Sequence, residues 1–219
     1  MRLFYFTTER FGLEAIRDSR LKIARIHQLN DPFEFVGLAL YDRGQRKALR
    51  EWKQEMSKQF GLICMSRSWK HPLLWGHYAE KHQGLCLGFD VPDNNKFKPV
   101  RFVDARLTLQ DLGRNNLAEL DEDDMDKMVH TKFKAWEYEA EYRAFCALED
   151  SDPVSDLYFV PFSQEMRLAQ VVVGERSRVT RDRLARVLGR RAGAVSAFKA
   201  RAGFTKFEVV ENKRKSAWQ

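Results

Sequence analysis

Two carboxylates and a guanidinium recur at every second position in the segment WEYEAEYR. If this segment enters a strand, the period of two puts Glu139, Glu141 and Arg143 on one face. Carboxylates on one ridge can stabilise a positive charge that develops in a transition state. Glu139 and Glu141 are therefore candidate catalytic carboxylates, and Arg143 is a candidate substrate-binding residue.

The same segment also fits a purely structural role. Glu141 and Arg143, or Glu139 and an arginine, can form an ion pair that closes a turn. If the segment stays helical, Glu137 and Glu141 are neighbours at i,i+4. Structural ion-pair networks resemble active sites, so both interpretations stay open.

A second group of polar residues lies in the segment WGHYA. His77 could donate to a substrate phosphate or act as a general acid or base near neutral pH. Tyr78 could stack on a base. On a helix with apolar neighbours, His77 fits equally well as a partly buried histidine satisfied by the backbone or by Asp31.

A turn supplies the remaining candidate residues. Asn30 and Asp31 precede Pro32, a combination that favours a turn held by side-chain hydrogen bonds. We expect this turn to orient the central motif and help bind the substrate. As an enzyme, the protein is expected to have a cleft that unites seven residues: Asn30, Asp31, His77, Tyr78, Glu139, Glu141 and Arg143.

The usual motifs of cofactor and metal enzymes are missing. The sequence has no phosphate-binding loop, dinucleotide fingerprint, zinc-protease motif or nucleophile elbow, which disfavours kinases, Rossmann enzymes and zincins. His71, His77 and His82 are irregularly spaced, and the three cysteines sit singly in apolar runs. We therefore expect buried cysteines and no metal site.

The positive charge is concentrated at one end of the sequence. The chain carries 38 Lys or Arg against 31 Asp or Glu, a net of +7. Residues 175–219 hold 13 basic and 4 acidic residues, a net of +9, which leaves −2 for residues 1–174. Arg183, Arg186 and Arg190 belong to a helix capped by Thr180 and could attract a nucleic acid. The alternative is a surface that only solubilises the protein. Because no aromatic-rich stacking motif accompanies these arginines, we expect at most weak, sequence-independent binding.

The elements around these residues alternate between short strands and short helices without a regular crossover rhythm. This predicts an α+β fold with a mixed, largely antiparallel sheet flanked by short helices. Strands are expected at 3–7, 21–26, 61–66, 85–90, 97–103, 141–148, 156–162 and 168–174; helices from Thr8, at 43–60, from Pro72 to Gly84, at 121–135 and from Thr180; and a hairpin about Gly203.

Length and composition favour one folded domain. The 219 residues are 44% hydrophobic and 32% charged, enough for a buried core and a solvated surface. We expect a single α+β domain over residues 1–219, with a basic helix and hairpin at 176–219. The sequence lacks an uncharged apolar run of membrane-spanning length, and its first residues lack the apolar core of a signal peptide. This predicts a cytoplasmic protein with no membrane partner.

Three motifs together resemble those of a bacterial family. The segments NDPFE, WGHYA and WEYEAEYR occur in this order, with LFYFT at the start, CMSRS before the second motif, HQGLCLGFD after it and VVVG later. In this combination the chain resembles the bacterial domain-of-unknown-function family 2971 over roughly residues 3–175. The family's name implies no activity.

The order of elements also resembles the ADP-ribosyltransferase fold. Those enzymes share an opening strand-helix-strand, an aromatic central motif and a late strand with a Glu-x-Glu pair. The resemblance implies a transferase acting on a nucleotide cofactor, NAD, with Glu141 as its catalytic glutamate. One feature departs from that pattern, because Tyr5, Phe6 and Thr7 occupy the strand where such enzymes commonly place His or Arg to grip the adenosine ribose. The alternative is a non-enzymatic module that binds nucleic acid or an acidic protein through the basic C-terminal region.

Overall fold

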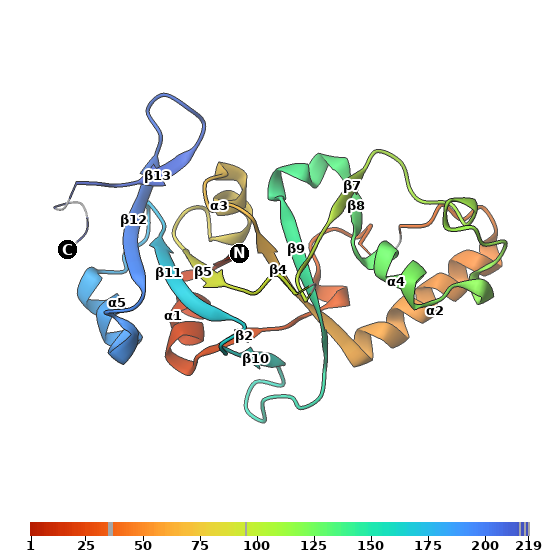
Figure 1. Cartoon of the computed structure of the whole chain (residues 1–219), viewed down its shortest axis with the longest axis horizontal. Coiled ribbons are helices and arrows are strands. Elements are labelled where there is room, and N and C mark those ends of the chain that lie inside the picture. Colours follow the sequence, from red (N-terminus) through yellow and green to blue (C-terminus); the bar gives the residue numbers. More distant parts are fainter. Residues whose placement is uncertain (35–36, 95, 215, 217, 219) are drawn as a thin grey trace. The chain divides into compact units, whose positions relative to one another are not determined.

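The chain forms an α+β structure, as predicted, in a computed structural model that describes residues 1–34, 37–94, 96–214, 216 and 218 (Figure 1). The strands are β1 (Arg2–Thr7), β2 (Arg20–Lys22), β3 (Ala24–Arg25), β4 (Phe60–Ser66), β5 (Leu85–Asp90), β6 (Lys98–Pro99), β7 (Arg101–Val103), β8 (Thr131–Phe133), β9 (Glu141–Ala147), β10 (Phe159–Pro161), β11 (Arg167–Val173), β12 (Ser196–Ala202) and β13 (Val209–Glu211). The helices are α1 (Glu9–Asp18), α2 (Arg43–Gln59), α3 (Pro72–Tyr78), α4 (Glu122–Val129) and α5 (Arg181–Leu188), with short 3₁₀ helices that include η4 (Lys134–Glu139) and η5 (Gly189–Arg191).

Contacts divide the chain into two compact units. Unit 1 comprises Met1–Lys22, Cys64–Asn94 and Phe159–Gln219. Unit 2 comprises Ile23–Ile63 and Asn95–Tyr158. Each unit is therefore assembled from segments that are distant in the sequence.

Unit 1 is built on a mixed, largely antiparallel sheet. Its strands follow the order β13-β12-β11-β5-β1, with the last residues of β4 beside β1. β1 pairs with β5 and β5 with β11 in antiparallel fashion, whereas β11 and β12 are parallel. β12 and β13 form the predicted antiparallel hairpin. This agrees with the predicted fold class.

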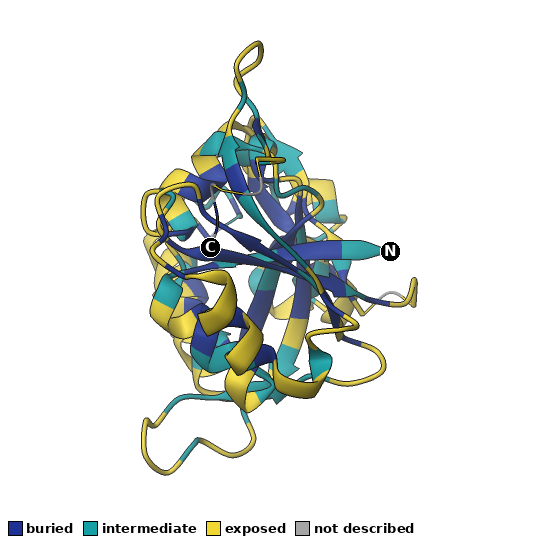
Figure 2. Cartoon of the chain, turned by 90° about the vertical axis from the view of Figure 1, so that its left-hand side faces the viewer, coloured by how far each residue is buried: buried dark blue, intermediate teal, exposed yellow. Residues whose placement is uncertain are grey.

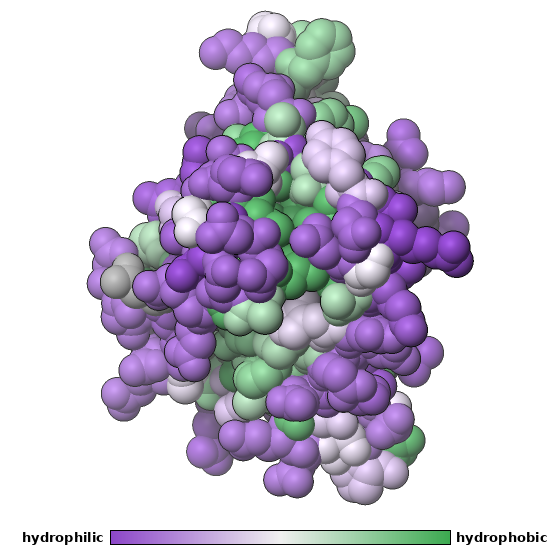
Figure 3. All heavy atoms as spheres, turned by 90° about the vertical axis from the view of Figure 1, so that its right-hand side faces the viewer, coloured by the Kyte–Doolittle hydropathy of each residue, from purple (hydrophilic) through white to green (hydrophobic). Residues whose placement is uncertain are grey.

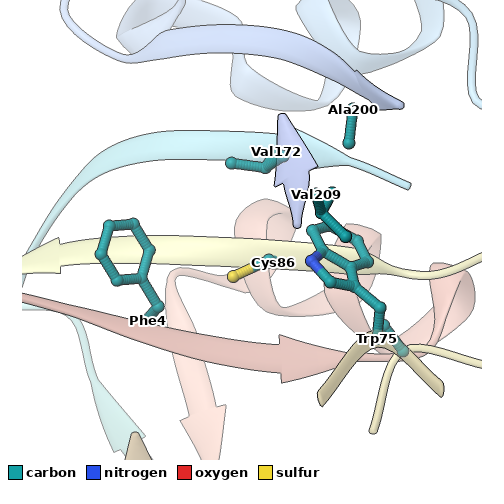
Figure 4. Close-up of a cluster of buried hydrophobic side chains, with 7 residues drawn as sticks. Phe4, Trp75, Cys86, Val172, Ala200 and Val209 are labelled. Carbon is teal, nitrogen blue, oxygen red and sulfur yellow. The ribbon is translucent and has the colours of Figure 1, made fainter. Parts of the chain in front are cut away.

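The two faces of this sheet are covered by different helices. Cys86 of β5, Phe4 of β1 and Val172 of β11 share a cluster with the fully buried Trp75 of α3 (Figure 4). Because adjacent strand residues face opposite sides, Leu85 lies on the other face, where α1 approaches so closely that a Cβ on Gly12 would be 2.8 Å from it. α5 packs against α1. In Figure 2 the strands are mostly buried, whereas α5 exposes its outer side.

Unit 2 has a second core under two helices. Leu38, Leu49, Leu109 and Met128 are buried together, with Leu49 supplied by α2 and Met128 by α4. On the side seen in Figure 3, apolar residues gather between hydrophilic ones. In this unit β3 pairs with the start of β4, β6 with β9, and β7 with β8. The pair of β7 and β8 is parallel and presents Lys132 to the interior.

One predicted helix of unit 2 differs from the structure. The helix expected at 121–135 ends at Val129, because residues 131–133 leave it to pair with β7 as β8. Tertiary pairing overrides local preference at this place. The strand expected at 141–148 is confirmed as β9, and the residues before it, 134–139, form the 3₁₀ helix η4, so Glu139 does not belong to the strand.

In unit 1 the predicted helix from Pro72 to Gly84 is too long. α3 ends at Tyr78, and Glu80, Lys81 and His82 all take left-handed backbone angles. This turn is fixed by hydrogen bonds from the backbone N–H of His82 to Trp75 and of Gly84 to Ala79. Every helix formed by the described residues is too short or too polar to span a lipid bilayer.

Candidate functional site

Unit 2 buries a cluster of five charged side chains. Each is at most 8% exposed, although residues of these types are almost never fully buried unless they are paired. They come from the turn after Pro32, from β8, from η4 and from β9. The members are Glu34, Lys132, Glu139, Glu141 and Arg143.

Lys132 contacts all three carboxylates of the cluster. Its Nζ lies 2.6 Å from Oε2 of Glu139, 3.0 Å from Oε2 of Glu141 and 3.1 Å from Oε1 of Glu34. It also lies 5.0 Å from the ring centroid of Trp136, within range of a cation–π interaction. The ammonium group therefore joins the NDPFE turn to the WEYEAEYR segment within one unit.

Arg143 supplies the second cation. Its Nε donates to Oε1 of Glu141 at 2.8 Å, and its Nη2 donates to Oε2 of Glu141 at 3.0 Å and to Oε1 of Glu34 at 2.7 Å. Its Nη1 donates to the backbone oxygen of Val129 at 2.7 Å. This two-pronged contact with Glu141 is the geometry that a planar guanidinium prefers. The structural ion pair considered for Glu141 and Arg143 is thus present.

Electrostatics keep Lys132 charged. Burial disfavours its ammonium form, but attraction by Glu141, Glu34 and Glu139 outweighs that penalty and raises its pKa above the ordinary value. Buried charges are tolerated when they are paired and hydrogen-bonded, as they are here. Three carboxylates against two cations leave the cluster with a formal charge of −1.

Local turns bring the cluster together. The Asp31 side chain accepts a hydrogen bond from the backbone N–H of Phe33 at 2.8 Å, and the N–H of Glu34 donates to the backbone oxygen of Asp31. Lys53 of α2 donates to the backbone oxygen of Glu34. Ala140, with a φ of 42°, turns the chain from η4 into β9. This left-handed residue lets Glu139 and Glu141 approach the same ammonium from two different elements.

A pocket of about 270 Å³ opens beside the cluster within unit 2. Phe33 and Phe133 on its wall are each more than half exposed, and the guanidinium of Arg106 lies 5.1 Å from the Phe33 ring centroid. Glu34 and Lys132 belong both to the wall and to the charged cluster. The described lining residues are Asp31, Phe33, Glu34, Gly37, Val103, Asp104, Ala105, Arg106, Thr131, Lys132 and Phe133.

One oxygen of the cluster is left over. Oε2 of Glu34 is buried and has no hydrogen-bond partner among the described residues, while Oε1 contacts both Lys132 and Arg143. Leaving a buried acceptor unsatisfied is costly, and native structures do so rarely. Glu34 is also one of the residues that line the pocket.

The predicted site residues are distributed over both units. Unit 2 holds Asn30, Asp31, Glu139, Glu141 and Arg143; of these, Asn30 is exposed and Asp31 lines the pocket. The cluster contains Glu139, Glu141 and Arg143, which are joined to the pocket through Lys132 and Glu34.

His77 and Tyr78 belong to unit 1. His77 is exposed on α3, so the alternative interpretation of a partly buried histidine is wrong. Its ring lies 6.1 Å from that of the half-buried Tyr78 in an edge-to-face arrangement. The catalytic role of His77 and the stacking role of Tyr78 stay predictions.

The arginines of the basic helix are exposed but partly occupied. Arg183 pairs with Glu9 of α1 at 2.7 Å, and Arg186 donates to the backbone oxygen of Asp182. Arg190 follows in η5.

Among the described residues, no group of His, Cys, Asp or Glu has an arrangement that could hold a metal ion. Lys132 occupies the place between the three carboxylates that a cation would take.

Two site residues escaped the sequence analysis. Glu34 ends the NDPFE motif, in which the sequence pattern indicates only Asn30 and Asp31 as turn-forming site residues. Lys132 lies in the segment predicted as a helix at 121–135, where a lysine normally faces water. The burial of Lys132 depends on its three carboxylate partners, which the local sequence does not reveal.

The comparisons with known proteins gave one match, which covers part of the chain. The model of a family described as a protein of unknown function, DUF2971, matches residues 74–144. This segment contains both WGHYA and WEYEAEYR, and it includes four of the five cluster residues. No curated protein and no solved structure matches the chain.

Proposed function

We propose that the protein binds a small molecule in the pocket of unit 2 and that Glu34 accepts a hydrogen bond from it. The observation that carries this proposal concerns Glu34, a residue of the pocket wall: its Oε2 is buried and has no hydrogen-bond partner among the residues that the structure describes. Pre-placed acceptors of this kind are common in ligand sites, where a few fixed polar groups stand among apolar ones.

The pocket suggests what the ligand looks like. Its volume of about 270 Å³ suits a single ring system rather than a whole dinucleotide. Phe33 and Phe133 offer aromatic surface for a flat ring. Asp31, Glu34 and Asp104 outnumber Arg106 and Lys132 on the wall, which favours a neutral or cationic group with N–H donors over an anion.

Glycosyl or ADP-ribosyl transfer is the reaction that we propose for this site. Nicotinamide combines a flat ring with amide N–H donors, so the nicotinamide end of NAD fits the described wall. In the transfer step the N-glycosidic bond breaks, nicotinamide leaves with the bonding electrons, and an acceptor bonds to the ribose carbon. Glu34 would then contact the ligand, and Glu141 would hold Lys132 and Arg143 in position.

The test uses nicotinamide and nicotinate as matched probes. Calorimetric titration of the wild type should show binding of nicotinamide and at least about tenfold weaker binding of nicotinate, whose carboxylate is repelled by Glu34. Glu34→Gln should reduce this preference, and Glu137→Gln, an exposed glutamate of η4, should keep it. NAD consumption by wild type, Glu34→Gln and Glu141→Gln then tests the reaction separately.

Two results would overturn the proposal. If neither probe binds, or if Glu34→Gln keeps the full preference for nicotinamide, Glu34 is not the ligand's acceptor. If nicotinamide binds but NAD is not consumed, the pocket is a binding site and the transfer reaction is rejected.

A further inference from the structure

The hairpin of β12 and β13 presents two phenylalanines to solvent at its tip. Phe204 is 89% exposed and Phe207 is fully exposed. The hairpin projects from unit 1 in Figures 1 and 2. Single exposed apolar residues are ordinary, but two large rings on one tip mark a contact surface.

The tip is held in a defined conformation. The backbone N–H of Gly203 donates to the oxygen of Glu208 at 2.7 Å, and the N–H of Glu208 donates to the oxygen of Lys206 at 2.9 Å. A Cβ on Gly203 would lie 2.8 Å from both of those oxygens, so the turn requires glycine at this position. Below the tip, the N–H of Val209 donates to the backbone oxygen of Lys70. The rings are therefore displayed on an ordered turn.

Basic side chains accompany the two rings. The guanidinium of Arg201 lies 4.3 Å from the ring centroid of Phe204, and Lys206 stands between the two phenylalanines. The surrounding segment, residues 175–219, carries a net charge of +9. An anionic partner is thus favoured over a neutral one.

We propose that this hairpin tip binds single-stranded nucleic acid, with bases stacked on Phe204 and Phe207 and phosphates beside Arg201 and Lys206. Aromatic rings interleaved with cations are the usual means of binding single strands, because every unpaired base offers a flat face. A duplex hides those faces. The site is independent of the unit 2 pocket and uses none of the arginines of α5.

The spacing of the two rings favours nucleic acid over a membrane as the partner. A membrane interface would be favoured by a continuous apolar patch, whereas here Thr205 and Lys206 separate the two rings. Rings spaced by polar and basic residues match successive bases along a charged backbone.

The test measures fluorescence anisotropy of labelled oligothymidine, oligouridine and a DNA duplex of equal length. The wild type should bind the single strands more tightly than the duplex, and the affinity should fall as salt rises. Phe204→Ala combined with Phe207→Ala should weaken single-strand binding at least about tenfold. Tyr41→Ala, which removes another exposed aromatic ring, should leave it unchanged. Because all three rings are exposed, thermal melting should show wild-type stability for these variants.

Arg201→Gln combined with Lys206→Gln should reduce the salt dependence while keeping the preference for single strands. Three results would overturn the proposal: equal binding by the double phenylalanine variant and the wild type, equal binding of duplex and single strand, or the lack of oligonucleotide binding. Flotation with anionic phosphatidylserine vesicles is measured in parallel. Vesicle binding that depends on the two phenylalanines, without oligonucleotide binding, would assign the tip to membranes instead.

Discussion

At the scale of single residues, the central feature is a lysine that stays charged where water is excluded. Lys132 is held by Glu34, Glu139 and Glu141, and Arg143 balances one of the two negative charges that remain. Such a cluster is costly to break, because removing one partner leaves the others buried without compensation. It fixes the position of Glu34 at the pocket wall.

Replacing Lys132 by methionine should therefore destabilise the protein by about 3–5 kcal/mol, since three buried carboxylates lose their shared cation. Urea denaturation followed by circular dichroism measures the change in unfolding free energy. Lys134→Met is the matched control, because the ion pair of Lys134 with Asp104 is exposed and its loss should change little. Equal unfolding free energies of the two variants would show that the charged cluster does not stabilise the fold.

The pKa of Lys132 gives an alkaline prediction. Its folded-state pKa is raised above the ordinary value of 10.5, so its contribution is fully present below pH 10.5 and is lost as pH rises through the folded-state pKa. The unfolding free energy of the wild type should fall more steeply above pH 10.5 than that of Lys132→Met. If the unfolding free energies of the two proteins fall in parallel above pH 10.5, the alkaline loss of stability does not come from Lys132.

Asp31→Ala tests the turn that carries Glu34. The Asp31 side chain is buried and satisfies the N–H of Phe33, so its loss should cost about 1–3 kcal/mol. The same denaturation experiment measures this change. A change near zero would mean that the N–H of Phe33 finds another partner or is solvated.

The residue pattern predicted which residues belong to the charged cluster better than it predicted what each of them does. The alternation in WEYEAEYR indicated that Glu139, Glu141 and Arg143 belong together, and they do meet. The sequence could not indicate Lys132 or the unpartnered oxygen of Glu34, because both depend on pairing between segments about 100 residues apart. The catalytic assignments stay predictions.

At the scale of elements, strands were easier to predict than the ends of helices. The apolar runs of β1, β4, β5 and β11 lie where their patterns indicate. The predicted helix ends were wrong where tertiary contacts determine the end of the helix, as before β8 and at the left-handed turn after α3. That turn depends on Gly84, where a Cβ would collide with the backbone oxygen of Thr7.

Gly84→Ala should consequently destabilise unit 1 by about 1–3 kcal/mol or more, because the backbone must move to admit the methyl group. Gly76→Ala provides the contrast, since nothing lies within 4 Å of a Cβ there and alanine suits the helix α3. Thermal melting should show a lower midpoint for the first variant and an unchanged or higher one for the second. An unchanged melting midpoint for Gly84→Ala would refute the close approach of Gly84 to the backbone oxygen of Thr7.

At the scale of the whole molecule, the charge asymmetry invites a role in binding nucleic acid. Helix α5 and the hairpin share the basic segment, but the arginines of α5 already pair in part with Glu9 and the helix backbone. We expect the hairpin to contribute more than the helix. Composition alone could show the asymmetry but not this division, because it does not show which cations are already paired.

The combined variant Arg183→Glu, Arg186→Glu and Arg190→Glu checks this division. We expect oligonucleotide affinity to fall less than in the double phenylalanine variant, because the long-range attraction weakens while the stacking surface remains. Anisotropy titrations at low and physiological salt measure both. A larger loss in the arginine variant would move the binding site to α5.

The claim that the unit 2 pocket takes a ligand through Glu34 is tested most directly by nuclear magnetic resonance. Nicotinamide is titrated into ¹⁵N-labelled wild type and Glu34→Gln, and the backbone amide shifts are followed. In the wild type we expect saturable shifts at Phe33, Thr131 and Phe133, and in Glu34→Gln the same residues should respond weakly or not at all. Shifts confined to other residues, or equal responses in both proteins, would contradict this account.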